Sequence, residues 1–373
     1  MIYFDNAATS LLKPKAVPFA VHRAMTTMAS PGRGSHKPAM LAADTVLDCR
    51  LLLSSYFNIP NPEDVVFTFN ATHALNIAIN SIVSEGDKVV ISGYEHNSVT
   101  RPLKALNADI IIAASPLFDQ AAAIEAFKKA LPGAKCAVCN HVSNVFGFIM
   151  PIKEISELCK EFGVPLIIDA SQSAGVLPID LSKLNAAFTA MPGHKGLMGP
   201  QGTGILICNY ETKPILQGGT GSNSTLNTMP MYLPDRLEAG THNVSGIAGL
   251  EQGLKYLMSK PQNAILSHEQ NLCSAFANRA SRIPGIKLFF NEGMKYQTGV
   301  LSLYSEHMDC DVIAERLGKE GICVRAGLHC APTAHETVGT IEKGTVRFSF
   351  SPFNTMSEVN FAAETLKKIM NSI

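Results

Sequence analysis

Polar side chains follow several apolar segments of the chain at the points where those segments end. His96, Asn144 and Asp169 each come shortly after an apolar run. Lys195 lies in a glycine-rich turn, and Thr72 opens a helical pattern that follows another apolar run. Ligands of open α/β sheets bind beyond the carboxyl ends of the strands. The positions of these side chains therefore predict one shared site.

Each of these residue types suits a definite chemistry. A lysine amine forms Schiff bases with carbonyl cofactors, which makes Lys195 a candidate. Asp169 ends a buried strand, where a carboxylate is costly unless a cation such as a protonated ring nitrogen meets it. Thr72 and the helix amides around it suit a phosphate. Taken singly, residues of these types are more often a surface lysine, a capping or ion-paired aspartate and a helix cap. Their order on consecutive strand ends favours a functional site.

The segments that must position these residues alternate between strand and helix patterns. We expect strands at 65–69, 88–92, 109–113, 136–139, 164–168, 186–190 and 204–207, and helices at 71–83 and 152–162. Apolar strands between amphipathic helices predict an α/β fold with a buried, mostly parallel sheet. After residue 253 we expect helices at 254–283, 311–320 and 357–370, and strands at 286–290, 299–304 and 346–351. This α+β pattern predicts a second, smaller domain.

The composition excludes several classes of function. Lys+Arg 31 balances Asp+Glu 31 in 373 residues without a basic block, which argues against binding to nucleic acid. The first residues lack the pattern of a signal peptide, and the longest apolar stretches fall short of the roughly 20 residues that span a bilayer. Nine scattered cysteines fit a reducing compartment. We expect a cytoplasmic protein with no membrane or nucleic-acid partner.

Ordered motifs run through nearly the whole chain. They are Tyr3-Phe4-Asp5-Asn6-Ala7-Ala8-Thr9, Asn70-Ala71-Thr72-His73-Ala74-Leu75-Asn76, Glu95-His96-Asn97, His141-Val142-Ser143-Asn144, Ile168-Asp169-Ala170-Ser171-Gln172-Ser173, Gly193-His194-Lys195, Glu238-Ala239-Gly240-Thr241, Arg325-Ala326-Gly327-Leu328-His329-Cys330 and Arg347. Together they resemble the class V pyridoxal-phosphate enzymes of aminotransferase fold type I. Within this family they resemble the cysteine desulfurase and selenocysteine lyase group.

The resemblance implies an organisation of the chain. It implies a large cofactor-binding domain at 16–254 with a mostly parallel seven-stranded sheet. A smaller α+β domain at 255–373 would carry Cys330 and Arg347, and an N-terminal segment at 1–15 would pack with that domain. The resemblance also implies a homodimer with shared active sites.

The resemblance further implies pyridoxal 5'-phosphate as cofactor and a role for each motif. Lys195 would hold the cofactor as a Schiff base and move protons at the substrate Cα, Asp169 would pair with the ring nitrogen, and His96 would stack on the ring and take part in catalysis. The remaining implied cofactor ligands are Thr72, His73, Asn144, Gln172, His194 and, from a second subunit, Thr241. Arg347 would grip the substrate carboxylate, which suits a guanidinium, with Asn144 and Arg325 on the substrate side.

Cys330 determines the reaction class that the resemblance implies. In desulfurases a thiolate attacks the sulfur of bound L-cysteine, which yields L-alanine and a protein persulfide. Arg325 and His329 are expected to favour the thiolate of Cys330. The alternative interpretation is a buried structural cysteine. The motif resembles the group II form, whose short loop implies that a separate acceptor protein receives the sulfur.

Other readings stay open at this stage. A selenocysteine lyase would use a substrate that differs by one atom, and another class V lyase or aminotransferase would leave Cys330 incidental. A sulfur-relay protein without catalysis is a third possibility. Pro192 stands where the family has a small hydroxyl residue, which removes one phosphate contact. Ala326 and Leu328 make the substrate side more apolar than in the family.

The sequence predicts no metal site. Cys136 and Cys139 have the spacing of a metal knuckle, but they fall in an expected strand. Residues three apart in a strand point to opposite faces, so we expect both cysteines in the core. His329 and His335 lie near Cys330 without a further ligand at metal spacing.

Overall fold

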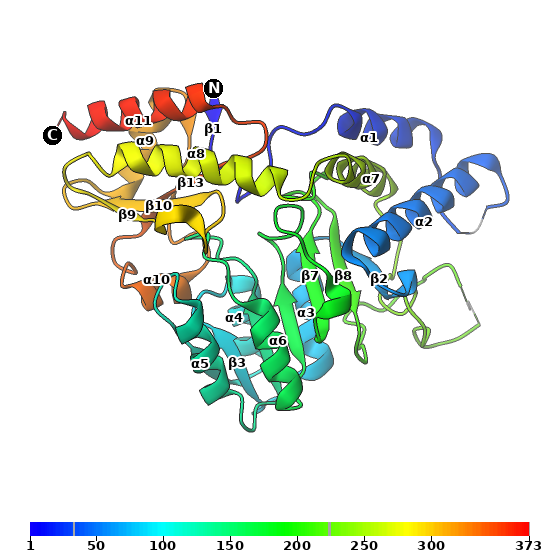
Figure 1. Cartoon of the computed structure of the whole chain (residues 1–373). Helices are drawn as coiled ribbons and strands as arrows, with labels where there is room; N and C mark the ends of the chain where they lie inside the picture. The colour runs from blue at the N-terminus through cyan, green and yellow to red at the C-terminus, as the bar shows by residue number, and fades with distance from the viewer. Residues whose placement is uncertain (33, 223–224, 373) are drawn as a thin grey trace.

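The computed structural model describes residues 1–32, 34–222 and 225–372 (Figure 1). Its centre is a seven-stranded sheet in the order β2-β8-β7-β6-β5-β3-β4. The strands are β2 (Val65–Thr68), β3 (Lys88–Ser92), β4 (Asp109–Ala113), β5 (Cys136–Asn140), β6 (Leu166–Asp169), β7 (Ala186–Pro192) and β8 (Gly204–Cys208). Strands β3 to β7 pair in parallel, and β8 runs antiparallel to both of its neighbours. The predicted mostly parallel seven-stranded sheet is confirmed.

Helices cover both faces of this sheet, so its central strands are apolar throughout. Every residue of β5 and β7 is buried, as strands covered on two sides require. The helices of this part are α1 (Ala16–Thr27), α2 (Lys37–Phe57), α3 (Ala71–Ile82), α4 (Asn97–Ala105), α5 (Gln120–Ala130), α6 (Ile152–Glu161) and α7 (Val244–Met258). Cys136 packs into the apolar cluster on one face and Cys139 into the cluster on the other. The prediction that the two face opposite sides is confirmed.

The C-terminal part forms a smaller α+β layer beside the large sheet (Figure 1). A four-stranded sheet has the order β12-β13-β10-β9, and a two-stranded sheet pairs β1 with β11. The strands are β1 (Ile2–Tyr3), β9 (Ile286–Phe289), β10 (Val300–Ser305), β11 (Ile322–Cys323), β12 (Arg325–Gly327) and β13 (Thr345–Ser349). The helices are α8 (Ala264–Ala280), α9 (Cys310–Lys319), α10 (Pro332–Val338) and α11 (Met356–Met370).

The single long helix expected at 254–283 is wrong. Helix α7 ends at Met258 and α8 begins at Ala264. Pro261 lies between them, and proline both lacks an amide donor and disfavours helix at the residue before it. Asn263 takes a left-handed conformation with φ 64° just before α8. The apolar periodicity continues across this break, which is why the pattern alone did not reveal it.

Two separate cores support a division into two domains. Leu254 and Leu257 of α7 pack in a core of the large sheet. Phe4 of the N-terminal segment packs instead with α8, α9, α11 and the small sheet. Both termini lie at this end of the molecule (Figure 1). The boundaries at residues 15 and 254 stay predictions.

No helix in the described part of the chain is both long and apolar enough to cross a lipid bilayer.

Candidate active site

One cavity collects the polar residues that follow the strands of the large sheet. Its lining consists of Asn70, Ala71, Thr72, His96, Ser98, Asn140, Val142, Asn144, Asp169, Ser171, Gln172, Pro192, His194 and Lys195. The carboxyl ends of parallel strands meet at one edge of a sheet, so residues far apart in sequence converge there. The structure thus brings together the predicted residues Thr72, His96, Asn144, Asp169, Gln172, His194 and Lys195.

The amino terminus of α3 forms one wall of the cavity. Asn70 caps this helix, because its Oδ1 accepts a hydrogen bond from the His73 amide at 2.9 Å. Thr72 Oγ1 lies 2.7 Å from Ser98 Oγ, so two hydroxyls stand together at the helix end. Gly204 at the start of β8 allows the backbone of Asn70 to pack closely against this strand, since a Cβ on residue 204 would lie 2.5 Å from the Asn70 carbonyl carbon. A capped helix terminus with two hydroxyls suits a phosphate.

Lys195, Asp169 and His96 form the charged centre of the cavity. Burial lowers the pKa of Lys195 to about 8, although Asp169 acts in the opposite direction. Asp169 Oδ1 accepts a hydrogen bond from the Ser171 amide at 2.9 Å, which fixes this carboxylate at the end of β6. Burial lowers the pKa of His96 to about 4. His96 is therefore neutral near pH 7.

His96 is held in one orientation by the start of α4. Its Nδ1 accepts a hydrogen bond from the Ser98 amide at 3.0 Å, so the neutral ring carries its proton on Nε2. Glu95, immediately before it, is fully buried, and its Oε1 accepts from Ser92 Oγ at 2.6 Å and the Asn140 amide at 2.7 Å. Burial raises the pKa of Glu95 to about 8, which makes it a neutral anchor for the loop that carries His96.

Sequence reasoning assigned no role to Glu95, Ser98 or Asn140. Ser98 supplies a hydroxyl in the cavity next to Thr72, in a site where Pro192 offers none. The signal for Glu95 was present, because a lone acidic residue between an apolar strand and His96 is unusual in a core. Asn140 directly follows the expected strand 136–139, so its position at a strand end was a signal as well. Nothing in the local pattern around Ser98 indicated that it would reach the cavity.

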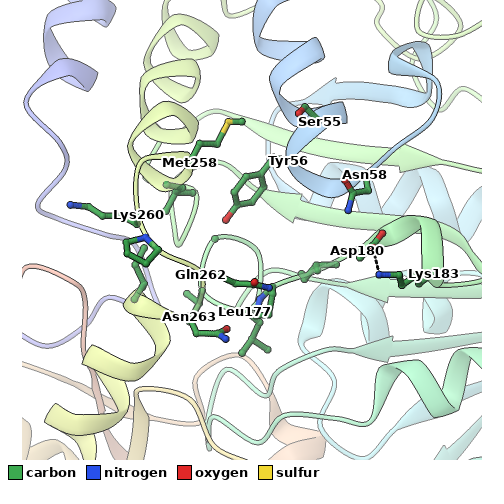
Figure 2. A pocket seen from close by; sticks show the side chains of 17 residues that line it. Ser55, Tyr56, Asn58, Leu177, Asp180, Lys183, Met258, Lys260, Gln262 and Asn263 are labelled. Carbon is green, nitrogen blue, oxygen red and sulfur yellow. Dashed lines mark ion pairs between the residues drawn. The ribbon is translucent and has the colours of Figure 1, made fainter.

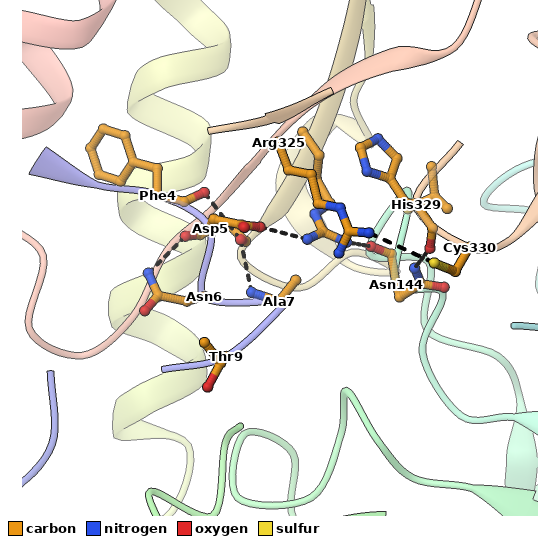
Figure 3. A network of polar contacts seen from close by, with 12 residues as sticks. Phe4, Asp5, Asn6, Ala7, Thr9, Asn144, Arg325, His329 and Cys330 are labelled. Atoms are coloured by element: carbon orange, nitrogen blue, oxygen red, sulfur yellow. Dashed lines mark hydrogen bonds and ion pairs between the residues drawn. The ribbon is translucent and has the colours of Figure 1, made fainter. Parts of the chain in front are cut away.

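Cys330 lies on the short connection between β12 and α10, close to Asn144, Arg325 and His329 (Figure 3). The Cys330 carbonyl accepts a hydrogen bond from the Asn97 amide at 2.8 Å. The His329 carbonyl accepts another from Asn144 Nδ2 at 2.9 Å. His329 and Cys330 have φ of 52° and 57°, a left-handed conformation that is uncommon outside glycine. These tethers fix the backbone of an exposed cysteine, and one of them ends on Asn144, which lines the cavity.

His329 does not support a thiolate in the way predicted from the sequence. Its Nε2 lies 3.0 Å from Thr345 Oγ1, and its side chain is buried. Burial, followed by the charge of Arg347, lowers the pKa of His329 well below its usual value, so the ring is uncharged. Arg325 acts as the neighbouring cation instead, with Nη2 at 3.7 Å from Cys330 Sγ.

Comparison with known proteins places this site in a family. The model of the aminotransferase class-V family matches residues 2–361. The chain belongs to this family. Class V aminotransferases are pyridoxal-phosphate enzymes, as the resemblance implied. The family assignment predicted from the motifs is confirmed.

Several relatives match this chain over nearly the whole of their own length. A probable cysteine desulfurase of Pyrococcus abyssi is 31% identical over 389 residues, which covers 100% of this chain and 95% of the relative. A probable cysteine desulfurase of Methanothermobacter thermautotrophicus is 31% identical and covers 99% and 94%. The solved cysteine desulfurase of Thermococcus onnurineus has a TM-score of 0.92 at 30% identity, covering 100% and 95%.

The residues of the class V site fit pyridoxal phosphate. The α3 terminus with Thr72 suits the phosphate, Asp169 suits a protonated ring nitrogen, and Lys195 suits a Schiff base because its pKa is lowered. Asn144 Oδ1 is buried and has no hydrogen-bond partner among the described residues. An unpaired buried acceptor in a polar cavity indicates that a donor from a bound molecule belongs there.

Arg347 is fully buried beside the cavity and does not line it. Its Nη2 donates to Asp5 Oδ1 at 2.7 Å, and its Nη1 donates to the Asn144 carbonyl at 2.9 Å. Arg347 thus adjoins the cavity through Asn144. The binding of a substrate carboxylate by Arg347 stays a prediction.

His73 and Thr241 lie in a neighbouring cavity together with Phe69 and Glu238. The His73 ring stacks on Phe69, with centroids 4.8 Å apart, and its Nδ1 accepts from the Phe69 amide at 3.3 Å. The side chain therefore faces away from Lys195, while the His73 amide belongs to the first turn of α3. Thr241 lines this neighbouring cavity and not the cavity that contains Lys195, and its role from a second subunit stays a prediction.

A larger cavity of about 480 Å³ lies apart from the class V site, between the end of α2 and segments 175–183 and 257–265 (Figure 2). Asp180 and Lys183 form an ion pair of 2.7 Å at its wall. None of the predicted site residues lines it. A Cβ on Gly175 would lie 2.3 Å from the Gly196 carbonyl, so close backbone packing separates this cavity from the turn that carries Lys195.

In the described residues, no three His, Cys, Asp or Glu side chains gather as metal ligands would.

Proposed function

We propose that this protein is a pyridoxal-phosphate-dependent cysteine desulfurase, a sulfurtransferase that converts L-cysteine to L-alanine and passes the sulfur to Cys330. The observation that carries this proposal is the exposed thiol of Cys330 on a loop tethered to Asn97 and to Asn144, which lines the same cavity as Lys195. The full-length relatives named cysteine desulfurase support the same reaction.

The residues of the cavity would have different roles in the reaction at the substrate Cα. When bound, pyridoxal phosphate supplies an electron sink for negative charge at this carbon. With a pKa of about 8, Lys195 holds a sizeable neutral fraction near pH 8 and so accepts the Cα proton there. Asp169 provides the negative charge that keeps a ring nitrogen protonated. Neutral His96, fixed through Nδ1, offers its Nε2 proton to groups in the cavity.

Cys330 would accept the sulfur atom. Its thiolate sulfur forms a bond with the substrate sulfur while the substrate Cβ–S bond breaks. The electron pair of the broken bond stays with Cβ, which gains a proton and becomes the methyl group of L-alanine. The products are a persulfide on Cys330 and L-alanine, so no external oxidant or reductant is consumed in this step. Arg325 stabilises the negative charge on the attacking sulfur from 3.7 Å.

The working form would be a homodimer. Exposed apolar side chains lie on α1 and α2, just before α3 and at positions 216 and 231: Phe19, Met25, Met40, Leu47, Leu51, Phe69, Leu216 and Met231. Helices α1 and α2 lie on the same side of the molecule (Figure 1). An exposed apolar patch is typical of an interface. A second copy on this face would bring its Thr241 toward the site.

A separate acceptor protein would remove the sulfur in the cytoplasm. The loop that carries Cys330 spans only residues 328–331 between β12 and α10 and is anchored by hydrogen bonds, so its reach is short. All nine cysteines are unpaired, as expected in a reducing compartment. The acceptor is expected to raise turnover when it is added to the enzyme and L-cysteine.

The test measures L-alanine and persulfide formed from L-cysteine by the wild type, Cys330→Ala and Cys323→Ala. Cys323 is a half-buried cysteine on β11 and serves as the matched control. Cys330→Ala should keep the visible absorption of the bound cofactor and lose at least about a hundredfold in alanine formation, whereas Cys323→Ala should behave as wild type.

Full alanine formation by Cys330→Ala would refute the proposal. A keto acid and a pyridoxamine form of the cofactor would instead indicate an aminotransferase. Assays with L-selenocysteine run in parallel, and loss of activity on L-cysteine alone in Cys330→Ala would show that selenium release needs no thiol from Cys330.

A further inference from the structure

The N-terminal segment of residues 2–10 connects the small sheet with the active-site cavity. The Phe4 carbonyl accepts from the Ser349 amide at 2.7 Å, so the segment pairs with the end of β13. Three residues on, the Ala7 carbonyl accepts from Gln172 Nε2 at 2.9 Å, and Gln172 lines the cavity. Asp5 is therefore held at the junction between the two sheets, and its motif has no role in the reaction described so far.

The side chain of Asp5 forms an ion pair with the guanidinium of Arg347. Arg347 Nη2 donates to Asp5 Oδ1 at 2.7 Å, and the Arg347 side chain is 1% exposed. The second nitrogen, Nη1, donates to the Asn144 carbonyl at 2.9 Å. Arg347 Nε is buried and has no partner within the described residues. Asp5 and Asn144 thus define the plane and rotation of this guanidinium.

The placement of Arg325 shows why Arg347 needs such a restraint. Arg325 and Arg347 are register partners on the antiparallel strands β12 and β13. Like charges directly opposite each other on a sheet repel. Without Asp5, the guanidinium of Arg347 would be a buried cation facing another cation, and it would turn away or draw in water. Asp5 offsets this repulsion and leaves one positive charge in excess.

The same three charges act on Lys195. Arg347 and Arg325 lower its pKa, and Asp5 raises it, after the larger effects of burial and of Asp169. Asp5, Arg325 and Arg347 are thus close enough to the Lys195 amine for their charges to affect its pKa, although Arg347 does not line the cavity.

We propose that Asp5 is a positioning residue that holds the Arg347 guanidinium in the orientation needed to bind the carboxylate of an amino acid substrate. This inference rests on the proposed function in one respect only, which is that the cavity takes an amino acid. It gives the N-terminal segment a part in substrate recognition, because Asp5 acts through Arg347 and not by touching the substrate.

The test compares two ligands that differ by a carboxylate, L-alanine and ethylamine. Their dissociation constants come from thermal stabilisation of the cofactor-loaded protein. Asp5→Ala should weaken L-alanine binding at least about tenfold, or about 1.4 kcal/mol, and leave ethylamine binding unchanged. Asp5→Asn should bind L-alanine more weakly than wild type but more tightly than Asp5→Ala, because its amide oxygen still accepts from Arg347 Nη2 while the charge that offsets Arg325 is lost. Asp311→Asn, an exposed site on α9, serves as the charge control.

A merely structural role for Asp5 would change both ligands alike or neither. Wild-type L-alanine affinity in Asp5→Ala, or an equal loss of ethylamine binding, would therefore overturn the proposal. If Asp5→Ala does not fold, Asp5→Glu decides, because it keeps the charge but displaces the guanidinium by one methylene. Selective loss of L-alanine binding in Asp5→Glu supports the proposal, and unchanged binding overturns it.

The outcome is separable from the proposed reaction. Alanine formation from L-cysteine by the wild type tests the desulfurase activity and does not depend on the ligand pair. A selective carboxylate effect in a protein that forms no L-alanine would support the role of Asp5 and refute the desulfurase. Alanine formation by the wild type, together with L-alanine binding that Asp5→Ala does not selectively weaken, would refute the role of Asp5 alone.

Discussion

Replacing the cap of α3 should weaken cofactor binding by an amount that the structure sets. Asn70 Oδ1 accepts from the His73 amide at 2.9 Å and so closes the first turn of a 12-residue helix. Loss of such a cap costs about 1 kcal/mol. In Asn70→Ala the first turn frays, and binding of the phosphate must reorder Ala71 and Thr72. This cost of about 1 kcal/mol makes the free energy of binding less favourable, which raises the Kd for pyridoxal phosphate about fivefold.

A second cap in the same protein supplies a matched control. Asp119 caps α5, with its Oδ1 accepting from the Ala122 amide at 2.9 Å. Residue 119 does not line the active-site cavity. Asp119→Ala should lower the free energy of unfolding by about 1 kcal/mol, as Asn70→Ala does, but leave the cofactor Kd unchanged.

The assay has two parts, urea unfolding of the protein prepared without cofactor and titration of the same protein with pyridoxal phosphate. Asn70→Ser keeps a capping oxygen and should retain the Kd within about twofold. Equal cofactor affinity in Asn70→Ala and wild type would refute the link between the cap and the phosphate. A loss in Asn70→Ser as large as in Asn70→Ala would show that Asn70 acts through direct contact.

Two further predictions follow from buried charges. Because burial lowers the pKa of Lys195 to about 8, the rate at which cofactor-free protein forms a Schiff base with added pyridoxal phosphate should rise about tenfold per pH unit below pH 8 and level off above it. Stopped-flow absorbance measures this rate. A rate that still rises at about pH 10 would indicate a lysine with an ordinary pKa. Glu238 is buried and pairs with Arg50 at 2.9 and 3.0 Å, so Glu238→Gln should lower the free energy of unfolding by about 3 kcal/mol at pH 7. Although burial opposes its ionisation, hydrogen bonds from His242 and Arg50 lower the pKa of Glu238. The contribution of Glu238 to the free energy of unfolding is therefore lost as the pH falls through that lowered pKa, and the values for the variant and wild type from urea unfolding should converge below about pH 4.5. A difference in this free energy that stays constant with pH would contradict the ion pair.

The strands of the large sheet could be predicted because burial on both faces demands near-continuous apolar runs. β3 and β4 match the expected 88–92 and 109–113. The break between α7 and α8 was missed because the apolar periodicity continues through it, and a single proline between two helices resembles a kink as much as an end. The parallel arrangement also places strand ends together, so the cavity residues on those ends could be predicted from their positions alone.

The sequence by itself determined which chemical groups the site contains. A lysine in a glycine-rich turn, an aspartate ending a buried strand and a cysteine after an arginine motif are visible without a fold. Their order along the chain, together with the motifs around them, also carries the resemblance that pointed to the family.

Only the tertiary structure decided how those groups are charged and directed. His329 is neutral because burial and the charge of Arg347 lower its pKa, although its hydrogen bond with Thr345 acts in the opposite direction. Arg347 is held by Asp5, which is 342 positions away in the chain. Arg325 stands opposite Arg347 because of the register of β12 and β13. Burial, side-chain direction and pairing depend on neighbours brought close by packing, and no local pattern in the chain records those neighbours.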